Sequence, residues 1–137
     1  MRVATFVLLT VWTIAVHDST PTSVRSGVYT SEQAGRGEAV YAQECASCHG
    51  PTLGGVEMAP ALTGDTFLAN WNGLTVADLV ERIKLSMPPD NPGRLSRAQN
   101  LDVVAFILKV GKYPPGTTEL PVAADMLKQI RIETPEP

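Results

Sequence analysis

The 137-residue chain has only two cysteines and two histidines, and its net charge is just −3. Two cysteines cannot form the disulfide network that holds small extracellular domains together. A slightly negative net charge argues against binding to nucleic acid, so we expect no nucleic acid partner. The longest apolar run, residues 3–16, is shorter than the roughly 20 residues that a membrane-spanning helix needs.

This apolar run follows Met1 and Arg2 at the start of the chain. A cation before a short apolar stretch is typical of a secretory signal peptide. We therefore predict that residues 1–16 direct export to the periplasm, and the alternative is an uncleaved segment that anchors the protein to a membrane. Residues 17–29 are polar and predict a leader, with folded structure from about Thr30 and a domain over residues 30–137.

Three segments carry the signals of helices, because each follows a Ser or Thr that has a polar residue three positions later. These pairs are Thr30 with Gln33, Thr75 with Asp78, and Ser96 with Gln99. They predict helices over about residues 31–45, 76–85 and 97–110. The Gly- and Pro-rich segments 49–70 and 87–94 predict loops, and residues 113–137 predict a tail with a short amphipathic segment at 122–130. No segment predicts a strand, so the fold class is all-α.

The short helices leave the hydrophobic core incomplete. Eleven prolines and eleven glycines favour loops over a self-sufficient helical bundle. We therefore expect a large apolar group, bound close to residue 45, to supply the missing part of the core.

The motif Cys45-Ala-Ser-Cys48-His49 is the strongest chemical signal in the chain. C-x-x-C-H is the attachment pattern of haem c, in which each thiol forms a thioether with a vinyl group of the porphyrin. The histidine after the second cysteine then serves as the proximal ligand of the iron. The motif predicts one haem c, attached through Cys45 and Cys48 and ligated by His49.

Two other kinds of site use the same residue types. A zinc site needs four ligands, and the only other candidate is His17, which lies in the leader. A thioredoxin-like redox pair needs a strand before the motif and a helix that begins at it, whereas this motif ends a predicted helix. Both alternatives are weaker than haem c.

A second ligand of the iron is expected among Met58, Met87 and Met126. Met87 is favoured, because a helix precedes it and Pro88 and Pro89 restrict the backbone that follows. Met58 comes only nine residues after His49 and has little chain with which to reach the opposite face of a porphyrin, so it is the runner-up. Met126 falls in the amphipathic segment, where a role in the core is the natural interpretation.

From about residue 30 to 112 the chain resembles class I c-type cytochromes. The matching segments are GRGEAVYAQECASCHG (35–50), APAL (59–62), MPP (87–89) and LDVVAFIL (101–108). The resemblance implies the cytochrome c fold, with three to five short helices around one haem that has His and Met ligands. It also implies that Phe106 packs across Gly37, that the carbonyl of Pro60 accepts a hydrogen bond from His49, and that Trp71 bonds a haem propionate.

The function that follows is a periplasmic electron carrier whose iron cycles between Fe(III) and Fe(II) without a substrate or catalytic residues. Its partners would be redox proteins, a dehydrogenase as donor or a terminal oxidase as acceptor. The tail beyond Tyr113 is similar to those of cytochrome c subunits that serve quinoprotein dehydrogenases, so an electron-accepting subunit is the alternative. A haem sensor or small peroxidase is a third possibility and requires that Met87 leave the iron open.

Overall fold

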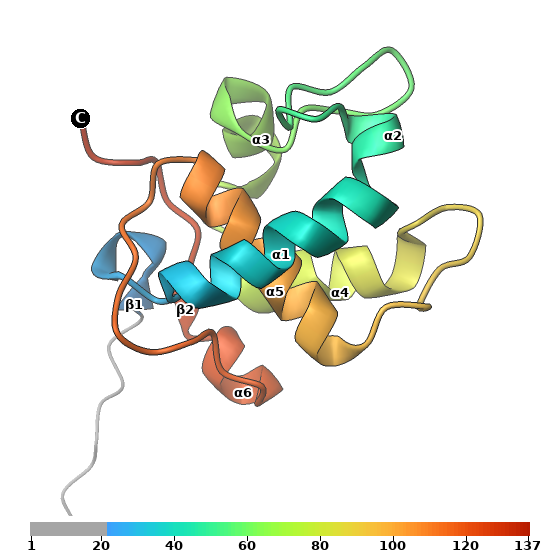
Figure 1. Ribbon diagram of the computed structural model, residues 1–137. Helices are drawn as coiled ribbons and strands as arrows, with labels where there is room; N and C mark the ends of the chain where they lie inside the picture. The colour runs from blue at the N-terminus through green and yellow to red at the C-terminus, as the bar shows by residue number, and fades with distance from the viewer. Residues whose placement is uncertain (1–21) are drawn as a thin grey trace, which may run out of the picture.

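The computed structural model describes residues 22–137, and the predicted signal peptide at residues 1–16 lies outside this range. The described elements are β1 (Thr22–Ser23), the 3-10 helix η1 (Val24–Ser26), α1 (Ser31–Glu44), α2 (Ala46–His49), α3 (Gly64–Trp71), α4 (Val76–Ser86), α5 (Arg97–Val110), α6 (Ala124–Leu127) and β2 (Ile130–Arg131). The predicted all-α class is confirmed (Figure 1). No helix within these residues is both long and apolar enough to cross a bilayer.

The three predicted helix starts are present. Thr75 and Ser96 form complete capping boxes with Asp78 and Gln99. Thr30 caps α1 by accepting a hydrogen bond from the amide of Gln33 at 3.1 Å. The side chain of Gln33, however, does not close the box. It is buried and accepts a hydrogen bond from the amide of Leu120 at 2.9 Å, so it holds the tail against α1 instead.

Helix α1 crosses α5 in the middle of the molecule, and this is the most extensive contact between two helices (Figure 1). The crossing depends on Gly37, because a Cβ atom there would clash with the backbone carbonyl of Asp102 and lie 3.0 Å from the Cβ of Phe106. The predicted contact between Gly37 and Phe106 is therefore present, although the backbone of Asp102 lies closer. The ring of Phe106 packs against Tyr41, with 5.3 Å between the ring centroids.

Two glycines of α1 give a matched pair of substitutions that tests this crossing. Gly37→Ala is expected to lower the free energy of unfolding by about 3 kcal/mol, because the helices must separate to admit the methyl group. Gly35→Ala places the same methyl group in open space and is expected to stabilise the helix by about 1 kcal/mol. Denaturant unfolding measures both changes. Equal effects of the two substitutions would mean that the helices do not cross at Gly37.

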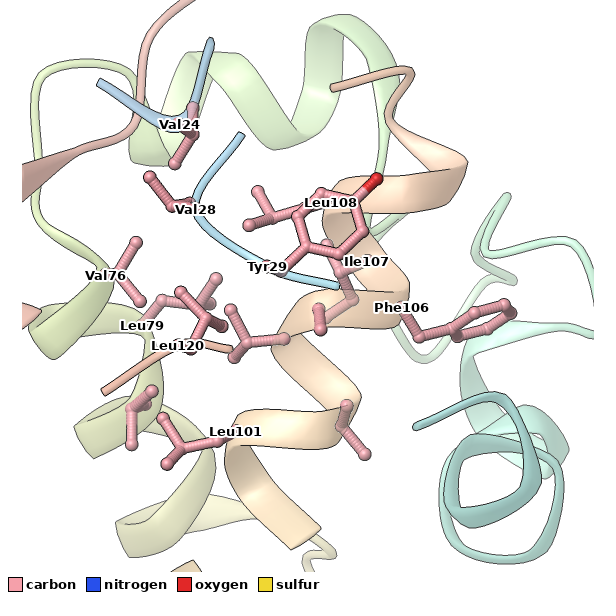
Figure 2. Packing of buried hydrophobic residues seen from close by; sticks show 14 of the residues in the cluster. Val24, Val28, Tyr29, Val76, Leu79, Leu101, Phe106, Ile107, Leu108 and Leu120 are labelled. Carbon is pink, nitrogen blue, oxygen red and sulfur yellow. The ribbon is translucent and has the colours of Figure 1, made fainter. Parts of the chain in front are cut away.

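A core made of protein side chains alone lies where α4, α5 and the tail meet. The expectation that the core is incomplete without a bound group is therefore wrong for this half of the molecule. Its most deeply buried large side chains include Tyr29, Leu101, Leu108, Leu127 and Ile132, each no more than 2% exposed. Figure 2 shows Phe106 on the other side of α5, pointing away from the labelled residues of this core.

Residues 22–29 belong to the fold, contrary to the expectation that structure begins near Thr30. Val24 is fully buried, and the hydroxyl of Tyr29 donates to the carbonyl of Tyr113 at 2.7 Å. Thr22 pairs with Ile130 in the short parallel sheet of β1 and β2, which the sequence did not predict. The segment and the tail thus hold each other through contacts between distant parts of the chain.

Two further expectations are wrong in detail. The predicted loop at residues 49–70 contains most of α3, whose Phe67 and Trp71 are one helical turn apart with their rings stacked at 6.2 Å. In the amphipathic segment the buried residue is Leu127, whereas Met126 is 58% exposed. The interpretation of Met126 as a core residue is therefore incorrect, because α6 turns its neighbour inward.

Candidate functional site

The cysteine motif occupies the junction between α1 and α2. Cys45 is both the C-cap of α1 and the N-cap of α2, and its carbonyl accepts a hydrogen bond from the amide of His49 at 3.0 Å. Cys45 and His49 are therefore one helical turn apart. Cys45 is half-buried, Cys48 is exposed and His49 is buried, and no disulfide joins the two cysteines. The fold thus presents the three motif residues on α2 and its N-cap.

The ring of His49 is held in one orientation by the loop that follows it. Its Nδ1 atom lies 2.8 Å from the carbonyl oxygen of Pro60, so the hydrogen bond expected between these residues is present. Since a carbonyl can only accept, Nδ1 must carry the proton, and the lone pair of Nε2 remains free for a metal. Gly55 lets the loop fold back, because a Cβ atom there would lie 2.8 Å from the carbonyl carbon of Pro60.

Tyr41 fixes the start of the same loop. Its buried hydroxyl donates to the carbonyl of Gly50 at 2.6 Å. Burial raises the pKa of Tyr41 to about 12, so the phenol remains neutral and keeps its proton for this hydrogen bond. The residue directly after His49 is thereby tied to α1.

A cavity of about 550 Å³ lies between the motif and helices α3, α4 and α5. Its walls are mostly apolar, with side chains from Leu62, Leu79, Ile83, Val103 and Ile107. Cys45, His49, Pro60, Trp71 and Met87 also line it. An adjoining hollow of about 470 Å³ shares four of these residues and adds Cys48 and Met58. Each of the six residues predicted for the site thus lines the cavity, the hollow or both.

The three methionines differ in their relation to this space. Met87 follows the last residue of α4, is half-buried and lines both the cavity and the adjoining hollow. Met58 is 92% exposed and lines only the adjoining hollow. Met126 lines neither of the two. Of the three methionines, only Met87 lines both spaces, whereas Met58 shares only the hollow with His49.

The chemistry of these groups fits an iron porphyrin better than a redox disulfide or a zinc ion. Burial raises the pKa of the Cys45 thiol to about 11, whereas reactive redox cysteines have a lowered pKa. Within residues 22–137, no three His, Cys, Asp or Glu side chains come together as metal ligands. A large apolar cavity with one imidazole and one thioether on its walls suits an iron porphyrin, whose metal these two groups would ligate.

Arg82 and Asn70 also line the cavity, and sequence reasoning missed both. In the described part of the chain the side chain of Arg82 forms no hydrogen bond or ion pair. The other five arginines of that part each form at least one: Arg25, Arg36, Arg94, Arg97 and Arg131. A signal was available, because Arg82 follows Leu79 by three positions and therefore shares the face of α4 that leads to Met87.

Comparisons with known proteins give the family and the fold of the chain. The family model described as "Cytochrome C oxidase, cbb3-type, subunit III" matches residues 32–107, more than half of the chain. No curated protein matches the chain. Among solved structures, the sulfane dehydrogenase SoxCD from Paracoccus pantotrophus contains a similar chain, with a TM-score of 0.58 and 19% identity. That match covers 90% of this chain and 66% of the other, and it shows a shared fold.

Proposed function

The chain, an electron-transfer haem protein, belongs to the family described as cytochrome c oxidase, cbb3-type, subunit III, and we propose that it carries electrons through one haem c attached to Cys45 and Cys48. When bound, haem c supplies a one-electron couple between Fe(III) and Fe(II). The observation that best supports this proposal is the hydrogen bond from His49 to Pro60 beside an apolar cavity that Met87 also lines.

Each residue of the site has a separate role in this proposal. His49 presents Nε2 to the iron, because Nδ1 is occupied by the carbonyl of Pro60. Met87 provides a thioether as the second ligand, which favours the ferrous state and a positive potential. The apolar side chains of α4 and α5 exclude water from the site. With both ligand positions filled by protein, the site would bind no substrate.

Arg82, Asn70 and Trp71 are the groups that we assign to the polar edge of the haem. Haem carries two propionates, and none of the ion pairs among the described residues includes the Arg82 guanidinium. Trp71 has one indole N–H to donate. An arginine and a carboxylate form a strong, charge-assisted pair. We therefore propose that Arg82 binds the propionates together with Trp71, for which the resemblance to class I cytochromes implies the same role.

The assignment of Arg82 predicts a change of reduction potential. Arg82→Gln is expected to lower the potential, because removal of a nearby positive charge stabilises the more positive ferric site. Lys84→Gln is the matched control, since Lys84 lies on the same helix but does not line the cavity. A spectroelectrochemical titration measures both. Equal shifts in the two variants would show that Arg82 acts only through the overall charge of the protein.

A redox titration of the wild-type protein tests the function itself. We expect a reversible one-electron transition with no added substrate, and a ferrous form that binds carbon monoxide only slowly or weakly. Rapid, tight binding of carbon monoxide by the wild type would instead support a haem sensor or small peroxidase, because it would show an open position at the iron.

A subunit of a periplasmic dehydrogenase remains the second candidate. It is favoured by the structural match to a SoxCD chain, because that match covers 90% of this chain while the family model ends at residue 107. Co-purification from native cells separates the two roles. A stable dehydrogenase complex supports the subunit, whereas a free monomer supports the carrier. Fractionation of the same cells tests the export that residues 1–16 predict.

A further inference from the structure

The segment that carries Met87 is fixed mainly at its ends. The amide of Met87 donates to the carbonyl of Ile83 at 2.8 Å, and Leu95, just before α5, is buried. Residues 89–94 between these points are exposed to solvent. We term residues 87–95 the methionine loop. Its own backbone hydrogen bonds, from the amide of Asn91 to the carbonyl of Pro88 at 3.1 Å and from the amide of Arg94 to the carbonyl of Asn91 at 3.4 Å, stay within the loop. Contacts with other elements therefore decide how the loop lies.

One ion pair ties the methionine loop to the helix that leads into the cysteine motif. The Nη2 atom of Arg94 contacts a carboxylate oxygen of Glu44, the last residue of α1. The two side chains are 34% and 25% exposed, so the pair is partly shielded from water. Within residues 22–137, no other side-chain hydrogen bond or ion pair connects residues 87–94 to α1. The contact between Arg94 and Asp90, at 3.4 Å, stays within the loop.

The position of this pair places it beside the ligand site. Glu44 and Arg94 line the same hollow as Cys48, Met58 and Met87. Glu44 directly precedes Cys45, the proposed first attachment residue. A displacement of the methionine loop away from this hollow would therefore have to break the ion pair first.

We propose that the pair of Glu44 and Arg94 is a latch that keeps Met87 on the iron and limits entry of small external ligands. This inference rests on the proposed ligation by Met87. Arg94 and Glu44 are positioning residues, because they act on the site only through the backbone of the loop. A partly shielded ion pair resists loop opening more than a fully exposed one does, since water screens it less.

Imidazole binding to the ferric holoprotein tests the latch, because imidazole can reach the iron only after Met87 leaves it. Glu44→Gln and Arg94→Gln are each expected to raise the rate of imidazole binding by about two- to fivefold. Glu38→Gln is the matched control, since Glu38 lies on the same helix and pairs with Lys109 at 3.3 Å, away from the loop. It should leave the rate unchanged. The charge exchange of Glu44→Arg with Arg94→Glu should return the rate toward that of the wild type.

The outcomes separate the latch from the proposed ligation. The latch is supported if imidazole binds faster to Glu44→Gln and to Arg94→Gln, while Glu38→Gln and the charge-exchange variant bind it about as fast as the wild type does. If Glu44→Gln binds imidazole at the same rate as Glu38→Gln and the wild type, and the thioether-to-iron absorption band is intact, the latch is wrong. The assignment of Met87 as a ligand then still stands. Absence of that band from the wild type overturns the ligation by Met87, and the latch with it.

Discussion

The double substitution Cys45→Ala and Cys48→Ala is expected to remove haem from the protein and to unfold most of the chain at room temperature. Without the thioethers, nothing covalent holds the group in the apolar cavity. The apolar walls of this cavity would then face water instead of the porphyrin, and burial of apolar surface is the dominant favourable term in folding. Because a typical domain is stable by only about 5–15 kcal/mol, the loss of this burial is expected to unfold most of it.

Visible absorption and far-UV circular dichroism measure the two parts of this result. Ser47→Ala is the control, because it lies between the cysteines, is not expected to bond to the haem and should change neither signal. The core of α4, α5 and the tail is protein alone, so some helical signal can remain in the double variant. A haem-free variant with the full helical signal and an unchanged cooperative melting transition would show that the haem is not part of the core.

Met87→Ala is expected to open one ligand position of the iron. The ferrous protein should then bind carbon monoxide rapidly, and the ferric protein should lose the absorption band of thioether-to-iron charge transfer. The reduction potential should fall, because a thioether favours ferrous iron more than water or hydroxide does. Optical titration with carbon monoxide and a redox titration measure these changes.

Met58→Ala and Met126→Ala are matched controls for this substitution. Both side chains are largely exposed, and neither lines the cavity of about 550 Å³, although Met58 borders the adjoining hollow. They should leave the band and the potential nearly unchanged. If Met58→Ala lost the band and Met87→Ala kept it, Met58 would be the ligand instead of Met87.

The features that the sequence predicted are those that depend on local chemistry. The caps at Thr75 and Ser96 satisfy amides three residues away, and α4 and α5 begin where these residues predict. The cysteine motif needs one helical turn, and the structure provides it. The contact of His49 with Pro60 spans eleven residues and was expected only through the resemblance to class I cytochromes.

The features that the sequence did not predict depend on contacts between distant segments. Gln33 has the spacing of a capping box, but its side chain binds Leu120, which lies 87 residues away. The order of residues 22–29 depends on the tail, and the pairing of Glu44 with Arg94 depends on how the methionine loop lies against α1. Local patterns carry no information on these contacts, because each requires the packed fold to bring its partners together.

Mass spectrometry of the mature protein after extraction with acidified acetone tests the central claim most directly. Thioether bonds resist this treatment, whereas a haem held only by its iron ligands is removed. The proposed site predicts that one haem stays on the polypeptide, on a proteolytic fragment that contains Cys45 and Cys48. Extractable haem, no haem, or a haem on a fragment without these cysteines would contradict it.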